Sequence, residues 1–471
     1  MSAPAQSATV AVTPARAHAA DAPRSPAARV LLGIAAGDAA GWPAGRHRAH
    51  GMPAWTRRLA RELDLFAEQG GVTTLPVPVA LNQAPGPLRL GPSDDAEWAA
   101  LTAYALLDAV PPDASGVRAA PDASGVRAAL DRHWTALATQ LTAPRAEPAA
   151  HASEEPPPAF RARISVRTSL ANLAAGLAPP ACGHDNPHYF DDAACVRAAV
   201  LATLCPGEPR AAAALAEYDA RYTQDGDGVL GARAVAAAVA AGLGGADAAA
   251  AVGAALAELP ATTAIGRAAH EAVAHARRAM GEDDGAGGDG REGGHGREGG
   301  EAGEHRREGG DAGTAAFALV PVLEHEIVDH VYSYGVAAAE TVPVALALTL
   351  AARGRVEAAL PAAACLARVA DSAPALTGAL TGALGAVVPA PWRAACRWLS
   401  GCAVPRLAGT DLLALAARLD ALVPARETQR EPARGTHPEP AREARRGPTQ
   451  TPLREKTTAP AAGAGKDGST S

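Results

Sequence analysis

Apolar residues recur at helical spacing along most of the chain. The stretch "LGPSDDAEWAALTAYALLDA" is the clearest case, because its Ala, Leu and Tyr positions repeat every three or four residues after residue 95. The same spacing occurs from Ala28 in "AARVLLGIAAGDAAGWP", where we expect interruptions at Gly37, Gly41 and Pro43, and in "PAWTRRLARELDLFAEQ". No segment alternates apolar and polar residues convincingly, as a half-buried strand would. The pattern therefore predicts an all-α fold.

Three segments lack the apolar residues that a packed core requires. Residues 1–27 and 425–471 are dominated by small and polar residues, and the second of these is rich in Pro, Arg and Thr. Residues 281–313 consist largely of glycine and charge, with no apolar residue larger than Ala. Such segments cannot bury enough surface to offset their ordering entropy. We predict disordered segments at 1–27 and 425–471, and one helical domain over 28–424 with a flexible insert at 281–313.

Composition and charge narrow the expected partners and compartment. Lys and Arg number 43 against 50 Asp and Glu, a net charge of −7, and there is no basic stripe, so we do not expect nucleic acid as a partner. The most apolar stretch, "TVPVALALTLAA", is shorter than the roughly 20 residues that span a membrane. The N-terminus has no secretory signal pattern. The 6 cysteines form no CxxC pair, and we interpret them as buried thiols in a reducing, cytoplasmic compartment.

Four oxygen-bearing side chains stand within five residues at the start of the best predicted helix: Ser93, Asp94, Asp95 and Glu97. An N-cap serine followed by acids in the first turn would complement the helix dipole by about 0.3–1 kcal/mol for each acid. The same oxygens could instead hold a divalent cation, since Mg²⁺ and Mn²⁺ prefer oxygen ligands. The local sequence leaves both interpretations open.

A second acid, Asp371, poses the same choice in "VADSAPALTGALTGALGA". Pro374 lies just inside the predicted helix, which is the position that proline favours at a helix start, so Asp371 and Ser372 could simply begin that helix. They could also bring oxygen ligands from a part of the chain far from residue 94.

Three segments share a pattern when they are taken in order. "GIAAGDAAGWP" at 33–43 matches GxxxGDAxGxP, and "GPSDDAEW" matches a T-D-D-T segment with Ser93 at the first threonine and Asp94 and Asp95 at the aspartates. "VADSAPALTGALTGALGA" matches a D-T-D-T segment, with Asp371 at the second aspartate and Ser372 at the following threonine. In these motifs and their order, over roughly 28–423, the chain resembles the ADP-ribosylglycohydrolase family.

The resemblance implies an all-helical hydrolase that depends on a divalent metal, Mg²⁺ or Mn²⁺. It implies metal ligation by Ser93, Asp94, Asp95, Asp371 and Ser372, with Asp94 and Asp95 as the catalytic residues. In the implied reaction the metal holds ribose hydroxyls of ADP-ribose while water attacks the anomeric carbon and releases the acceptor. The implied partner is an ADP-ribosylated protein or a small ADP-ribose conjugate.

The chain departs from the family pattern at three positions. Gly45 stands where the family has a glutamate, Val369 where it has an aspartate, and Ala96 where it has a threonine. These replacements therefore remove ligand side chains of one metal position in more than one part of the chain. We predict one well-held ion, with the second position weakened. Glu97 is the neighbouring acid that could substitute.

Weaker candidates for substrate binding are Asp38 in the first motif and His184, Asn186 and Tyr189 in "GHDNPHYFDD". An aromatic ring there could stack on adenine. The alternatives are that Asp38 is an ordinary turn residue between two glycines, and that the aromatic loop packs onto the core.

Three functions remain open from the sequence. The first is hydrolysis of a glycosidic bond to ADP-ribose. The second is a degenerate relative that binds ADP-ribose or a related nucleotide without turnover, which the missing acids favour. The third is a helical scaffold with an interaction-prone tail. Ligand binding separates the scaffold from the other two, and turnover separates those two from each other.

Overall fold

The computed structural model describes residues 25–41, 91–110, 121–143, 159–282, 312–329 and 335–423. Within these ranges the fold is all-helical, as predicted, and β-structure is confined to two isolated bridges, Asp191–Ala337 and Trp398–Asp411. Several predictions from the sequence concern residues outside the described ranges. These residues are the predicted helix near 53–69, Gly45, almost all of the N-terminal segment and of the glycine-rich insert, and the C-terminal tail.

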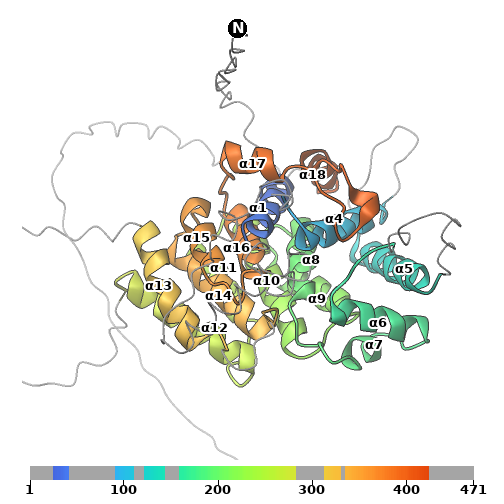
Figure 1. Ribbon diagram of the computed structural model, residues 1–471, viewed down its shortest axis with the longest axis horizontal. Coiled ribbons are helices and arrows are strands. Elements are labelled where there is room, and N and C mark those ends of the chain that lie inside the picture. Colours follow the sequence, from blue (N-terminus) through green and yellow to red (C-terminus); the bar gives the residue numbers. More distant parts are fainter. Residues whose placement is uncertain are drawn as a thin grey trace, which may run out of the picture. The chain divides into compact units, whose positions relative to one another are not determined.

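The described helices are as follows (Figure 1). They are α1 (Pro26–Gly41), α4 (Asp94–Leu107), α5 (Ala123–Thr142), α6 (Ile164–Ala174), α7 (Ala181–His184), α8 (Ala193–Leu201), α9 (Pro209–Ala220), α10 (Asp227–Leu243), α11 (Ala248–Leu256), α12 (Ala264–Ala279), α13 (Ala312–Glu326), α14 (Ala338–Ala351), α15 (Val356–Ala364), α16 (Ala373–Ala383), α17 (Ala390–Cys396) and α18 (Leu412–Asp420), with short 3₁₀ helices η4 (Ala202–Leu204) and η5 (Pro405–Leu407).

Helices α1 and α16 pack with their backbones in close approach. A Cβ atom added to Gly33 would lie 2.0 Å from the carbonyl oxygen of Gly378, and one added to Gly37 would lie 2.0 Å from that of Pro374. Glycine is therefore required at these contacts, since any larger residue would force the helices apart. The prediction that Gly37 interrupts the first helix was wrong, because α1 is continuous to Gly41 and its glycines serve helix packing.

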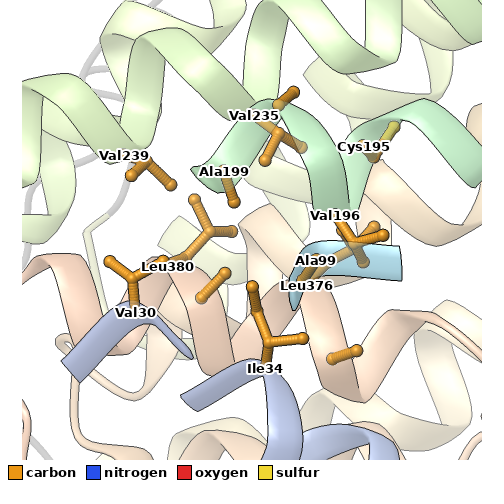
Figure 2. Close-up of a cluster of buried hydrophobic side chains, with 14 of the residues drawn as sticks. Val30, Ile34, Ala99, Cys195, Val196, Ala199, Val235, Val239, Leu376 and Leu380 are labelled. Carbon is orange, nitrogen blue, oxygen red and sulfur yellow. The ribbon is translucent and has the colours of Figure 1, made fainter. Parts of the chain in front are cut away.

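One part of the core lies between α1, α4, α8, α10 and α16 (Figure 2). Branched aliphatic side chains from α1 and α16 face small residues of α4 and α8 and two valines of α10. Because the residues that α4, α8 and α10 contribute here are Ala, Val and Cys, the helices approach closely and the side chains fill the space between them. The labelled members are Val30, Ile34, Ala99, Cys195, Val196, Ala199, Val235, Val239, Leu376 and Leu380.

A buried polar and aromatic cluster joins α4, α5, α8 and α9. The ring of Trp134 stacks on Trp98 with centroids 6.5 Å apart and on Tyr222 at 5.7 Å. Its indole N–H donates to Asp219 at 2.8 Å, and Arg197 Nε donates to the other carboxylate oxygen of Asp219 at 2.8 Å. This cluster fixes the helices on one side of the candidate site.

The expectation that the six cysteines are buried thiols is only partly met. All six cysteines are free thiols; Cys182, Cys195 and Cys396 are buried, whereas Cys205, Cys365 and Cys402 are half-buried. Among the helices that the structure describes, none is both long enough and apolar enough to cross a membrane.

Candidate functional site

Three helix N-termini bring acids to one place. Asp94 and Asp95 begin α4, Asp192 immediately precedes α8, and Asp371 stands two residues before α16. Helix N-termini stabilise negative charge through their free N–H groups and dipoles. The side chains of Asp95, Asp192 and Asp371 are at most 4% exposed, and that of Asp94 is 19% exposed.

The guanidinium of Arg163 lies in the middle of these four carboxylates. Its Nη2 donates to Asp95 Oδ1 at 2.9 Å and to Asp371 Oδ2 at 3.2 Å, and its Nη1 donates to Asp192 Oδ1. Its Nε lies 3.7 Å from Asp94 Oδ2. The four acids, from three helices, are thus gathered on one positive charge.

The hydroxyl of Ser372 completes this arrangement. It accepts a hydrogen bond from Arg163 Nη2 at 2.7 Å and donates one to Asp192 Oδ1 at 3.2 Å. Asp371 and Ser372 therefore stand just before α16, as the sequence allowed, and both contact Arg163. Their role as metal ligands stays a prediction. We call Asp94, Asp95, Asp192, Asp371 and Ser372 the acid cluster.

Burial and close opposite charges shift the pKa values of Arg163 and Asp192. Burial acts to lower the pKa of Arg163, but the carboxylates of Asp95, Asp192, Asp371 and Asp191 outweigh it and raise that pKa well above its ordinary value. Burial raises the pKa of Asp192 to about 6, although the charge of Arg163 acts in the opposite direction. Arg163 is thus held as a permanent cation.

Ser93 points away from the acid cluster. Its backbone N–H donates to Asp38 Oδ2 at 2.7 Å, its hydroxyl donates to Asp38 Oδ1, and the N–H of Ala96 also reaches Asp38 Oδ2, at 3.1 Å. Asp38 is fully buried. It therefore caps α4 from α1, in the place of the serine cap that the sequence suggested, and the described contacts give it a structural role.

Glu97 and Val369 add no oxygen to the acid cluster. The carboxylate of Glu97 accepts hydrogen bonds from the backbone N–H groups of Cys402 at 2.9 Å, Ala403 at 2.9 Å and Val404 at 2.6 Å. It holds the 402–404 loop and is not positioned as a substitute acid. Val369 is fully buried in the apolar core.

The aromatic loop is held by its own contacts. The amide nitrogen of Asn186 donates to the carbonyls of Gly183 at 2.7 Å and Thr223 at 3.1 Å, so this side chain is used to build the loop. His184 pairs with Asp225, and Tyr189 is 42% exposed. The contacts described for His184, Asn186 and Tyr189 are made within this loop and with residues outside the acid cluster, and their role in binding stays a prediction.

A divalent ion does not fit the arrangement as the described residues have it. Of the predicted ligands, Asp94, Asp95, Asp371 and Ser372 surround the Arg163 guanidinium, and Ser93 is turned to Asp38. Among the residues that the structure describes, no group of three or more His, Cys, Asp or Glu side chains is placed to hold a metal. Metal binding therefore stays a prediction from the sequence.

Two residues of the site were missed by the sequence reasoning. Asp192 carried a usable signal, because "DDAA" at 191–194 places an acid pair at a helix start, as "DDAE" does at 94–97. Arg163 carried none, since "AFRARISVR" contains three arginines and nothing in the pattern distinguishes the middle one.

Comparisons with known proteins bear on the family of the chain. A family model described as ADP-ribosylglycohydrolase matches residues 19–431. A solved chain described as "ADP-ribosylglycohydrolase-related protein complex" is 19% identical, with a TM-score of 0.42, over 85% of this chain and 97% of that chain. The comparison with curated proteins gave no match.

Proposed function

Given that the chain belongs to the ADP-ribosylglycohydrolase family, we propose that the acid cluster binds the ribose of an ADP-ribosyl conjugate and that the protein hydrolyses its glycosidic bond. The observation that carries this proposal is the convergence of Asp94, Asp95, Asp192 and Asp371 from three helix N-termini. Their oxygens can accept hydrogen bonds from the hydroxyls of a sugar, and such bonds fix the orientation of the ring.

The chemistry of the acid cluster suits a glycosidic reaction. Cleavage passes through a transition state with positive charge on the sugar ring, and nearby carboxylates stabilise that charge. Asp94 is the most exposed acid of the cluster, and we assign it the task of taking a proton from the attacking water. The water oxygen bonds to the anomeric carbon as the bond to the acceptor breaks. The proton that Asp94 takes from the water passes to the departing acceptor, so the two products together hold the elements of water.

Release of free ADP-ribose from ADP-ribosylated arginine and serine peptides tests this proposal. We expect release by the wild-type protein and a loss of about 100-fold or more in Asp94→Ala, since a general base contributes typically 10²–10⁴-fold. The matched control is Asp108→Ala, an exposed acid at the other end of the same helix. Equal rates in Asp94→Ala and the wild type would rule out this role for Asp94.

Binding without turnover is the second candidate, and two specific observations favour it. Val369 stands at a position where the family has an acid, and Arg163 uses oxygens of three carboxylates that a reacting ligand or metal would otherwise meet. ADP-ribose binding with no release of product from any peptide would support this candidate and exclude the hydrolase.

A further inference from the structure

We propose that the guanidinium of Arg163 is a built-in cation that takes the place of the divalent metal, so that this chain binds its ligand without metal. The inference rests on the proposed function for the identity of the ligand, because it concerns the same acid cluster. The prediction about metal binding itself needs no ligand.

The first support is where the positive charge lies. Four of the five residues that the resemblance assigns to the metal contact Arg163: Asp95 at 2.9 Å, Asp371 at 3.2 Å, Ser372 at 2.7 Å and Asp94 at 3.7 Å. The fifth, Ser93, is bound to Asp38. A metal needs oxygens at about 2.0–2.1 Å for Mg²⁺. The guanidinium holds the same side chains at hydrogen-bond distances, so the two cations compete for one position.

The second support is that the chain holds Arg163 in this position. The backbone N–H of Arg161 donates to the carbonyl of Ala403 at 2.6 Å, and the ring of Phe160 meets Trp98 edge-on at 6.0 Å. These contacts fix the segment that leads to α6. The side chain of Arg163 is only 11% exposed.

The third support is the small size of the cavity beside Arg163. A cavity of about 10 Å³ lies beside it, lined by Trp98, Val166 and Val196 among others. That volume is about enough for one water and far too small for a guanidinium. Arg163 therefore cannot leave the acid cluster by moving into this cavity.

The fourth support is the loss of alternative oxygens for a metal. Val369 replaces an acid, the Ser93 hydroxyl is bound to Asp38, and Glu97 is bound to the 402–404 loop. Among the residues that the structure describes, these three candidates for completing a metal's coordination shell are therefore replaced or in structural use. Because arginine stays charged at all physiological pH values, the replacement cation is permanent.

A Mn²⁺ titration followed by the electron paramagnetic resonance of free Mn²⁺ tests the inference. We expect the wild-type protein, without any nucleotide, to bind Mn²⁺ at least tenfold more weakly than Arg163→Ala, in which the carboxylates are left uncompensated. The matched control is Arg167→Ala, one turn further along α6 and exposed, which should behave as the wild type. Should Arg163→Ala not fold, Arg163→Lys in the same titration should bind Mn²⁺ more tightly than the wild type, since one ammonium cannot bridge three carboxylates.

Tight, stoichiometric Mn²⁺ binding by the wild type that is lost in Asp371→Asn would overturn the inference, because the ion would then displace Arg163. The ligand gives an independent outcome. If neither Mn²⁺ nor ADP-ribose binds the wild type, but Arg163→Ala takes up Mn²⁺, the built-in cation stands and the proposed function fails.

Discussion

A Cβ atom on Gly378 would lie 1.9 Å from the carbonyl oxygen of Gly33, and the converse distance is 2.0 Å. The two glycines belong to two of the motifs that carry the family resemblance, one on α1 and one on α16. Their contact brings the two helices together close to the acid cluster, because Asp371 and Ser372 immediately precede α16. The glycines of these motifs therefore act through packing, whereas the acids supply the chemistry.

Substitution of Gly378 should be strongly destabilising. We expect Gly378→Ala to lower the free energy of unfolding by about 3 kcal/mol or more, since the added methyl meets backbone atoms and the helices must separate. Urea unfolding followed by circular dichroism measures this free energy.

Gly253→Ala is the control. Gly253 lies in α11, and an added Cβ there meets nothing within 4 Å. It should be neutral or stabilise by up to about 1 kcal/mol. Similar values for the two variants would contradict the packing role.

Glu97 should stabilise the fold by holding the 402–404 loop. Glu97→Gln places an amide NH₂ group opposite backbone N–H donors of this loop. We expect the free energy of unfolding to fall by roughly 3 kcal/mol, since buried hydrogen bonds to a charged group are lost. Glu271→Gln, at an exposed position on α12, should change it by less than about 0.5 kcal/mol. An unchanged stability in Glu97→Gln, with altered Mn²⁺ affinity, would restore Glu97 as a metal-site acid.

Acid should destabilise the protein in part through His133. Burial lowers the pKa of His133 to about 4, and Arg406 and Arg197 lower it further while Asp219 opposes them. The unfolded chain, with a histidine pKa near 6.5, binds a proton that the folded chain does not. Stability is therefore lost as the pH falls from about 6.5 to about 4, by up to roughly 3 kcal/mol.

Urea unfolding of the wild type and His133→Gln at pH 7, 5.5 and 4.5 isolates this contribution. The variant should lose less stability than the wild type over this range, because it has no proton to bind. Parallel losses in the two proteins would show that His133 does not contribute to the acid sensitivity.

The helices were predictable because local periodicity dominates them, and the all-α fold follows from it. Asp94, Asp95 and Asp371 could be named as candidates because each stands in a recognisable motif at a helix start, and all three contact Arg163. Their predicted role as metal ligands stays a prediction. The roles of Asp38 and Glu97 were not predictable, since each acts on a part of the chain that only the fold brings near. Arg163 was missed for the same reason: its partners lie up to 209 residues away in sequence, and no local pattern marks it.

We propose above that the acid cluster around Arg163 is the site of an ADP-ribosyl ligand. Calorimetric titration of ADP-ribose into the protein, with Mg²⁺ and again with EDTA, tests it most directly. We expect equal affinity in both conditions, at least tenfold weaker binding in Asp94→Ala and unchanged binding in Asp108→Ala. Undiminished binding in Asp94→Ala, or no binding in either condition, would contradict it.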